Sequence, residues 1–92
     1  MDIKELRAEI DQVDAELLQL FCRRMELSKD VALWKKEQGY PIFDSLREEE
    51  KLSRVAAEAE ENMGEYAREL WKKLMDLSKD YQKSLIDSGE VV

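Results

Sequence analysis

Apolar side chains recur along the first part of the chain with the alternating three- and four-residue spacing of a heptad helix. The repeating positions are Ile3, Leu6, Ile10, Val13, Leu17, Leu20, Arg24, Leu27, Val31 and Trp34. Residues three and four apart lie on one face of a helix, so the spacing predicts one continuous helix over about residues 2–37. Arg24 interrupts this apolar stripe. A guanidinium there needs an anion, which indicates either a carboxylate of the chain or an anionic ligand.

Two breaks divide the rest of the chain into a short and a medium helix. Gly39 and Pro41 end the first helix, because glycine accepts the left-handed conformation of a helix end and proline cannot continue a helix. The later apolar spacing predicts helices over about residues 44–60 and 64–87, and no stretch alternates as a strand does. The sequence therefore predicts an all-α fold of three helices in a single domain, residues 1–92.

The first helix is too long for a compact monomer of this size. About 35 helical residues extend about 52 Å, whereas a compact domain of similar length has a radius of gyration of about 12 Å. Because the apolar stripe runs along the whole helix, the overhanging part needs a partner. We expect an intertwined homodimer in which two copies cross antiparallel. Docking of the helix on a larger protein is the alternative.

Composition excludes several classes of function. The net charge of −7 argues against a nucleic-acid partner or an anionic membrane surface. No apolar run is long enough to span a bilayer, and the charged start lacks the core of a signal peptide, so we expect a cytoplasmic protein. The chain has no histidine and one cysteine, Cys22, which excludes Ser-His-Asp and Cys-His catalysis, an internal disulfide and a multi-cysteine zinc site.

Inward-facing polar residues interrupt the apolar faces of the predicted helices. Ser78 and Gln82 lie one turn apart on a stripe of the third helix that is otherwise apolar, so a hydroxyl and an amide point to the same place. Lys35 lies about three turns beyond Arg24 and points nearly the same way. The start of the second helix adds Asp44, Arg47 and Glu48. Together these residues predict a pocket with two or three cations and a few neutral donors.

Each of these residues also has a structural interpretation. Asp44 or Ser45 can cap the second helix, and Ser45 with Glu48 fits a capping box. Lys35 can interact favourably with the negative end of the helix dipole at the end of the first helix. Arg47 can be a solvated residue on the helix face. Ser78 and Gln82 can both form hydrogen bonds with another helix that serve packing alone.

A further set of residues, spread over the whole chain, points to a family. The set is residues 6–10 (LRAEI), Asp14, residues 24–27 (RMEL), Lys35, residues 41–48 (PIFDSLRE), Ser78 and Gln82. With these residues at this spacing, and with helices in the order long, short and medium, the chain resembles the all-helical class of chorismate mutase. The resemblance implies an isomerase that converts chorismate into prephenate, on the branch toward phenylalanine and tyrosine. It implies no metal, no cofactor and no covalent intermediate.

The resemblance also assigns roles to residues of this chain. The implied substrate-binding residues are Arg7, Arg24, Lys35, Asp44, Arg47, Glu48, Ser78 and Gln82, and the implied catalytic residues are Lys35, Gln82, Arg24 and Glu48. Arg24 and Arg7 would hold the two carboxylates, and Arg47 and Ser78 would complete those contacts. Lys35 and Gln82 would donate to the ether oxygen, with Lys35 also touching a carboxylate. Glu48 and the backbone around Asp44 would take the ring hydroxyl.

Arg7 connects the site to the expected homodimer. It lies 17 residues before Arg24, which is about 25 Å along one helix, so the two cannot reach the same small molecule from one chain. In the family, the corresponding arginine comes from the other subunit.

Other functions fit the same sequence. An isochorismate pyruvate lyase shares this scaffold and much of the cationic pocket. A non-catalytic helical dimer, used for interaction or regulation, would keep the polar positions only to fix its register. Both a free-standing chain and the first module of a fusion with a dehydratase or dehydrogenase are compatible with the sequence.

Overall fold

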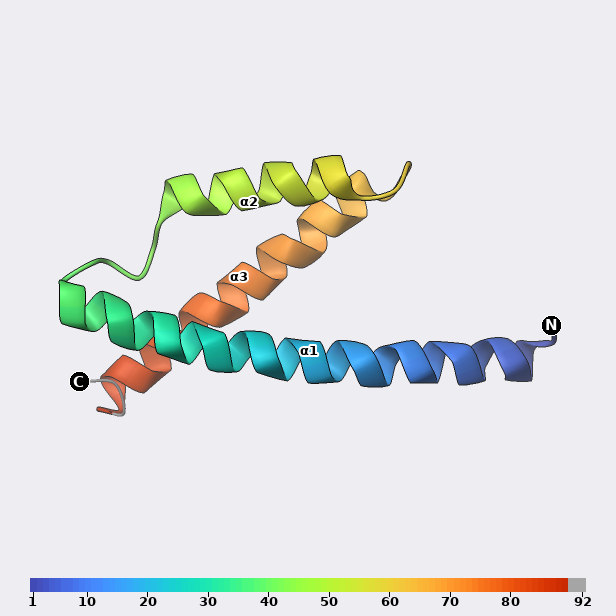
Figure 1. Cartoon of the computed structure of the whole chain (residues 1–92), viewed down its shortest axis with the longest axis horizontal. Coiled ribbons are helices and arrows are strands. Elements are labelled where there is room, and N and C mark those ends of the chain that lie inside the picture. The colour runs from blue at the N-terminus through green and yellow to red at the C-terminus, as the bar shows by residue number, and fades with distance from the viewer. Residues whose placement is uncertain (90–92) are drawn as a thin grey trace.

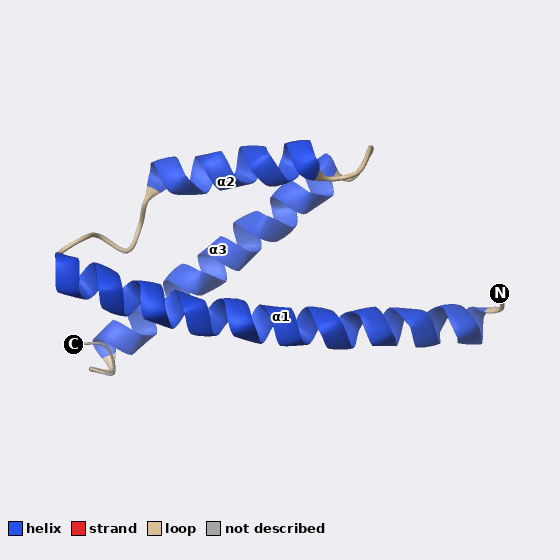
Figure 2. Cartoon of the chain, viewed as in Figure 1, coloured by secondary structure: helices blue, strands red, loops and turns tan. Residues whose placement is uncertain are grey.

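The protein consists of three helices joined by short loops. The computed structural model describes residues 1–89, which form α1 (Ile3–Gln38), α2 (Ser45–Glu58) and α3 (Gly64–Asp87) and contain no strand (Figure 2). The predicted all-α class with three helices is thus confirmed. α3 packs against both other helices, and in Figure 1 it crosses from the end of α2 to the C-terminal half of α1. The N-terminal half of α1 projects away from the other two helices.

Local hydrogen bonds define both ends of α1. The carboxylate of Asp2 accepts a hydrogen bond from the backbone N–H of Glu5 at 2.9 Å, which satisfies one of the free donors of the first turn. At the other end Gly39 adopts a φ of +75°, and the N–H of Tyr40 donates to the carbonyl of Lys35 at 2.8 Å. A positive φ favours glycine, so Gly39 both ends α1 and sets the direction of the next loop.

The cap of α2 differs from one of the two predicted forms. Asp44 has an extended backbone, and its Oδ1 accepts a hydrogen bond from the N–H of Arg47 at 3.0 Å. Ser45 is already the first helical residue, so the capping box of Ser45 with Glu48 is wrong. A carboxylate at the cap also suits the positive end of the helix dipole. The side chain of Glu48 is therefore left to contact Lys79 on α3.

The third helix has two neighbouring stripes of mainly apolar residues, and the chain buries only one of them. All buried residues of this helix belong to the stripe with the two polar positions, namely Met75, Ser78, Gln82 and Leu85. Leu85 packs on Ala32 of α1, which is fully buried. The other stripe of α3 includes Tyr66 and Leu70, whose side chains remain largely exposed.

Close approach of two backbones positions α3 against α2. A Cβ atom placed on Gly64, the first residue of α3, would lie 2.8 Å from the carbonyl oxygen of Ala56 on α2. Real Cβ atoms do not come this close to a backbone oxygen, so only glycine fits without movement of a helix. The contact holds the N-terminal end of α3 against the end of α2.

The apolar stripe of α1 is not buried within the chain. Every residue from 1 to 20 is exposed, and the nine apolar residues of the stripe each expose 42–62% of their surface. α1 meets α3 through Ser28 and Ala32, which lie beside the stripe. The molecule measures 53 × 27 × 14 Å, and its radius of gyration of 16.3 Å exceeds that of a compact domain. None of the helices in residues 1–89 combines the length and the apolar character needed to cross a membrane.

Candidate active site

A pocket of about 140 Å³ lies where the C-terminal half of α1, the start of α2 and the middle of α3 face one another. Its walls are formed by Arg24, Lys35, Ile42, Asp44, Arg47, Glu48, Lys51, Met75, Ser78, Lys79 and Gln82. Seven of the eight predicted substrate-binding residues are in this set. The eighth, Arg7, lies on the exposed N-terminal half of α1 and does not line the pocket.

The pocket is positively charged in an acidic protein. Five cationic side chains and two acidic ones line it, a net of +3, whereas the whole chain carries −7. One of the two acids, Glu48, is paired with Lys79. The other, Asp44, caps α2. The charge that remains attracts an anion of small size.

Arg24 has no carboxylate partner within the described part of the chain. Its Nη1 donates a hydrogen bond to Oγ of Ser78 at 2.7 Å, and none of the salt bridges formed by residues 1–89 includes it. Burial lowers the pKa of Arg24 below its usual value, and the nearby charge of Arg47 lowers the pKa further. Of the two explanations for an arginine in the stripe, the structure therefore favours a place for an anionic ligand.

Buried hydrogen bonds connect α1 and α3 next to Arg24. Gln82 Nε2 donates to the carbonyl of Ser28 at 2.7 Å, and Ser28 Oγ lies 3.0 Å from both the carbonyl of Arg24 and Oγ of Ser78. Ser28, Ser78 and Gln82 are the three buried polar residues of the described chain. The interhelical hydrogen bonds expected as an alternative are thus present. They still leave the second N–H of the Gln82 amide available to a ligand.

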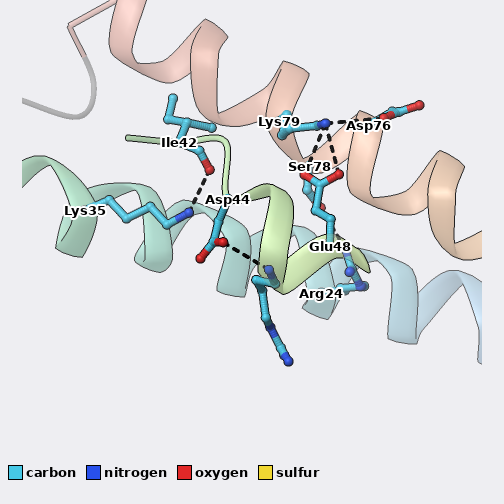
Figure 3. Close-up of polar contacts among 9 residues, drawn as sticks. Arg24, Lys35, Ile42, Asp44, Glu48, Asp76, Ser78 and Lys79 are labelled. Carbon is cyan, nitrogen blue, oxygen red and sulfur yellow. Dashed lines mark hydrogen bonds and ion pairs between the residues drawn. The ribbon is translucent and has the colours of Figure 1, made fainter. Parts of the chain in front are cut away.

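Lys35 is held by the loop after α1. Its Nζ donates to the carbonyl of Ile42 at 2.7 Å (Figure 3), and its side chain is partly buried. An ammonium group has three N–H donors, so two remain for a ligand. Lys35 therefore does more than interact with the dipole of α1, because its hydrogen bond to the loop holds its amine at the wall of the pocket.

The sequence analysis did not single out two polar residues that form hydrogen bonds with predicted site residues. Lys79 extends from α3 to Glu48, with 3.1 Å between Nζ and Oε2 (Figure 3). Ser28 lies one helical turn after Arg24, and its hydroxyl connects that residue to α3. Ser28 lies four residues after Arg24 and Lys79 lies three residues before Gln82, so helical spacing from a predicted residue was the available signal. Polar residues on solvated helix faces show the same helical spacing, so the spacing did not distinguish Lys79 and Ser28 from surface residues.

The arrangement favours binding and polarisation of a ligand over acid–base chemistry. Cationic groups from α1 and α2 face a space whose third wall offers a buried hydroxyl and a buried amide. Arg24, Lys35 and Gln82 each donate a hydrogen bond to another group of the protein, so these donors reorganise little when a ligand binds. Such a site suits a small molecule with more than one negative charge.

Comparison with known proteins gives a consistent result. The sequence model of the family described as chorismate mutase type II matches residues 6–83. The chorismate mutase of Methanocaldococcus jannaschii is 31% identical over 93 residues, which cover 96% of this chain and 91% of that protein. The T-protein of Haemophilus influenzae is 45% identical over 58 residues, which cover 63% of this chain but only 15% of that protein. Among solved structures, chorismate mutase (form II) from Thermus thermophilus matches with a TM-score of 0.84 and 34% identity, over 88% of this chain and 93% of that one.

Proposed function

This chain belongs to the chorismate mutase type II family and is an isomerase, and from that premise we propose that its pocket rearranges chorismate into prephenate. The observation that carries the proposal is the position of Arg24 in a partly buried, positively charged pocket without a carboxylate partner among residues 1–89. A substrate with two carboxylates supplies the charge that the pocket lacks. The reaction is intramolecular, so the pocket needs to supply shape and electrostatics only.

The first task of the site is to hold the substrate in its reactive shape. Arg24 and Arg7 of the partner subunit bind the two carboxylates, and Arg47 and the hydroxyl of Ser78 complete these contacts. Glu48 and the backbone at Asp44 take the ring hydroxyl at the start of α2. Holding the two reacting ends together contributes up to about 7–11 kcal/mol in favourable intramolecular cases.

The second task is to stabilise the charge that develops on the ether oxygen as its bond breaks. The two free N–H donors of Lys35 and the second N–H of Gln82 line the same pocket. Hydrogen bonds to Ile42 and Ser28 fix both groups before substrate binds. Donors held in advance lower the barrier because they do not reorganise during the reaction.

The active protein is a homodimer in this proposal, with one arginine of each site supplied across the interface. The stripe of α1 is exposed along its length, and an apolar groove of about 330 Å³ continues from Leu17 and Leu20 to Leu70 on α3. A second copy of α1 running antiparallel covers both surfaces and brings Arg7 of the partner subunit to the pocket. The volume of about 140 Å³ within one chain is below the usual range for ligand sites, as expected of a site completed by a partner.

The direct test is an assay of the purified protein with chorismate. Without added cofactors, we expect chorismate to be consumed and an equal amount of prephenate to form. Pyruvate formed from isochorismate at a higher rate would identify a lyase. A protein that shows no binding in a chorismate titration would be a non-catalytic helical module.

A change at Gln82 tests the donor to the ether oxygen. The native amide does not titrate, so activity should be broad through neutral pH. In Gln82→Glu, donation requires the protonated acid. Desolvation raises the pKa of the introduced carboxyl above its ordinary value of about 4.3, while Lys35 and Arg24 pull the pKa down. The variant should therefore work in acid and lose about tenfold in kcat/KM for each pH unit above that pKa.

The measurement is a pair of kcat/KM profiles from about pH 4 to 9. Gln82→Leu is the matched control, because it cannot donate at any pH and should be slow throughout. If Gln82→Glu and the native protein gave profiles of the same shape with similar rates at neutral pH, Gln82 would serve packing alone.

A further inference from the structure

Lys79 holds the carboxylate of Glu48 from the opposite helix. Its Nζ lies 3.1 Å from Oε2 and 3.2 Å from Oε1, so it contacts both oxygens (Figure 3). The exposed fractions are 29% for the Lys79 side chain and 20% for the Glu48 side chain, so the pair is partly withdrawn from solvent. A charge-assisted contact of this kind fixes the direction of a carboxylate better than a fully solvated pair does. The direction of Glu48, on α2, is thus set by α3.

Lys79 also contacts the loop that leads into α2. Its Nζ lies 4.5 Å from the centroid of the Phe43 ring, within the range of a cation–π interaction. The preceding residue, Ile42, accepts a hydrogen bond from Lys35. Residues 42 and 43 are therefore held between a lysine of α1 and a lysine of α3. Because this loop joins α2 directly, Lys79 contributes to the position of the first turn of α2 as well as to that of Glu48.

The charge of Lys79 is already compensated. Besides Glu48, Nζ lies 3.5 Å from Oδ1 of Asp76, one turn earlier on α3. With two carboxylates near it, Lys79 is a poor site for a carboxylate of the substrate, in contrast to Arg24. Its effect on a bound molecule is therefore transmitted through Glu48.

We propose that Lys79 is a positioning residue that aims Glu48 at the ring hydroxyl of the substrate and so contributes to the selection of a hydroxylated substrate. The inference rests on the proposed function and adds a residue to that site. The hydroxyl is not among the atoms whose bonds break or form. Its contact with Glu48 is therefore similar in the substrate and in the transition state, and loss of the contact weakens both to the same extent.

The experiment compares steady-state constants of single variants with chorismate as the substrate. Lys79→Met should raise KM about tenfold and change kcat less than about twofold, which is the pattern of lost uniform binding. Lys79→Arg keeps the cation and should stay within about threefold of the native KM. Lys83→Met, the matched control, removes a charge from an exposed position one turn further along α3 and should leave both constants unchanged.

A double-mutant cycle shows whether Lys79 acts through Glu48. In a Glu48→Gln background the carboxylate is absent, so Lys79→Met should change KM less than about twofold. A merely structural role of Lys79 would give the same loss in both backgrounds. Circular dichroism and melting curves establish that each variant is folded. If Lys79→Met does not fold, Lys79→Gln, a polar side chain without charge, takes its place in the cycle.

The outcomes separate this inference from the function on which it rests. A native chain that forms no prephenate overturns the proposed function and the inference with it. A native chain that is active, with Lys79→Met equal to Lys83→Met, overturns the inference alone. The inference also fails if Lys79→Met has the full effect in the Glu48→Gln background, since Lys79 would then contact the substrate itself or act only on the fold.

Discussion

Replacing Arg24 by methionine should remove most of the activity and raise the melting temperature of the ligand-free protein. Arg24 has no carboxylate partner among residues 1–89, and burial together with Arg47 lowers its pKa. A lowered pKa of a base means that the folded protein disfavours the charged form. Since an arginine stays protonated throughout the neutral range, the folded state carries this unfavourable energy at every working pH.

The size of the stabilisation depends on the free-energy cost of burying the charge of Arg24, which methionine removes. Arg24 is only partly buried, so the gain is about 0.5–1 kcal/mol, less than the 1–4 kcal/mol known for fully buried ion pairs. For a domain of this length, that corresponds to a rise of about 2–8 °C. The hydroxyl of Ser78 loses the guanidinium but still lies 3.0 Å from Oγ of Ser28. No buried polar group is then left without a partner, and the gain is not cancelled.

The same substitution should lower kcat/KM by about 10³-fold, because a charged donor to the substrate is removed from a preorganised site. Lys29→Met is the matched control, since Lys29 lies on α1, is exposed and does not line the pocket. Melting curves need equal protein concentrations, because the stability of a dimer depends on concentration. A variant that is clearly less stable and still active would contradict the role of Arg24.

Mixing two inactive chains should restore about one quarter of the native activity. In the proposed homodimer, Arg7→Ala would damage the site of the partner, and Arg24→Ala would damage the site of its own chain. Random pairing makes half of the dimers mixed, and each mixed dimer has one intact site and one site without either arginine. Refolding the two chains together from denaturant gives this mixture, and initial rates with chorismate measure the recovery.

The control is a mixture of Arg24→Ala with Lys35→Ala. Both residues line the pocket of their own chain, so every site in every dimer is damaged and no activity should return. Differently tagged chains show by co-purification that mixed dimers form. The shared site is excluded if mixed dimers form and the first mixture stays inactive, or if the control recovers equally.

Several features of the site could not be assigned from the sequence because they depend on how the helices cross. Ser78 and Lys79 are adjacent on α3, and helical spacing alone puts either of them near the second helix. The close approach at Gly64 brings the start of α3 against the end of α2, and in this packing Lys79 faces Glu48. In the same way, the path of the loop decides that Ile42 meets Lys35.

Periodicity along the chain was enough to predict the three helices and the inward position of Arg24. These properties depend on neighbours within one or two turns, and the sequence states those neighbours directly. The apolar stripe predicted on α1 is not buried by the chain itself, because α3 packs beside it on Ser28 and Ala32. Local spacing identifies an apolar face without identifying its partner.

The sequence by itself determined the all-α fold, the ends of α1 and most of the polar residues that line the pocket, since each follows from short-range spacing, capping or a family pattern. The tertiary structure decided which faces meet. It brought seven predicted residues into one pocket, left Arg7 on the projecting half of α1, chose Asp44 as the cap of α2 and paired Glu48 with Lys79. These outcomes join residues far apart in the chain. They depend on helix crossings, which are set by packing and by close contacts such as that at Gly64 rather than by local sequence.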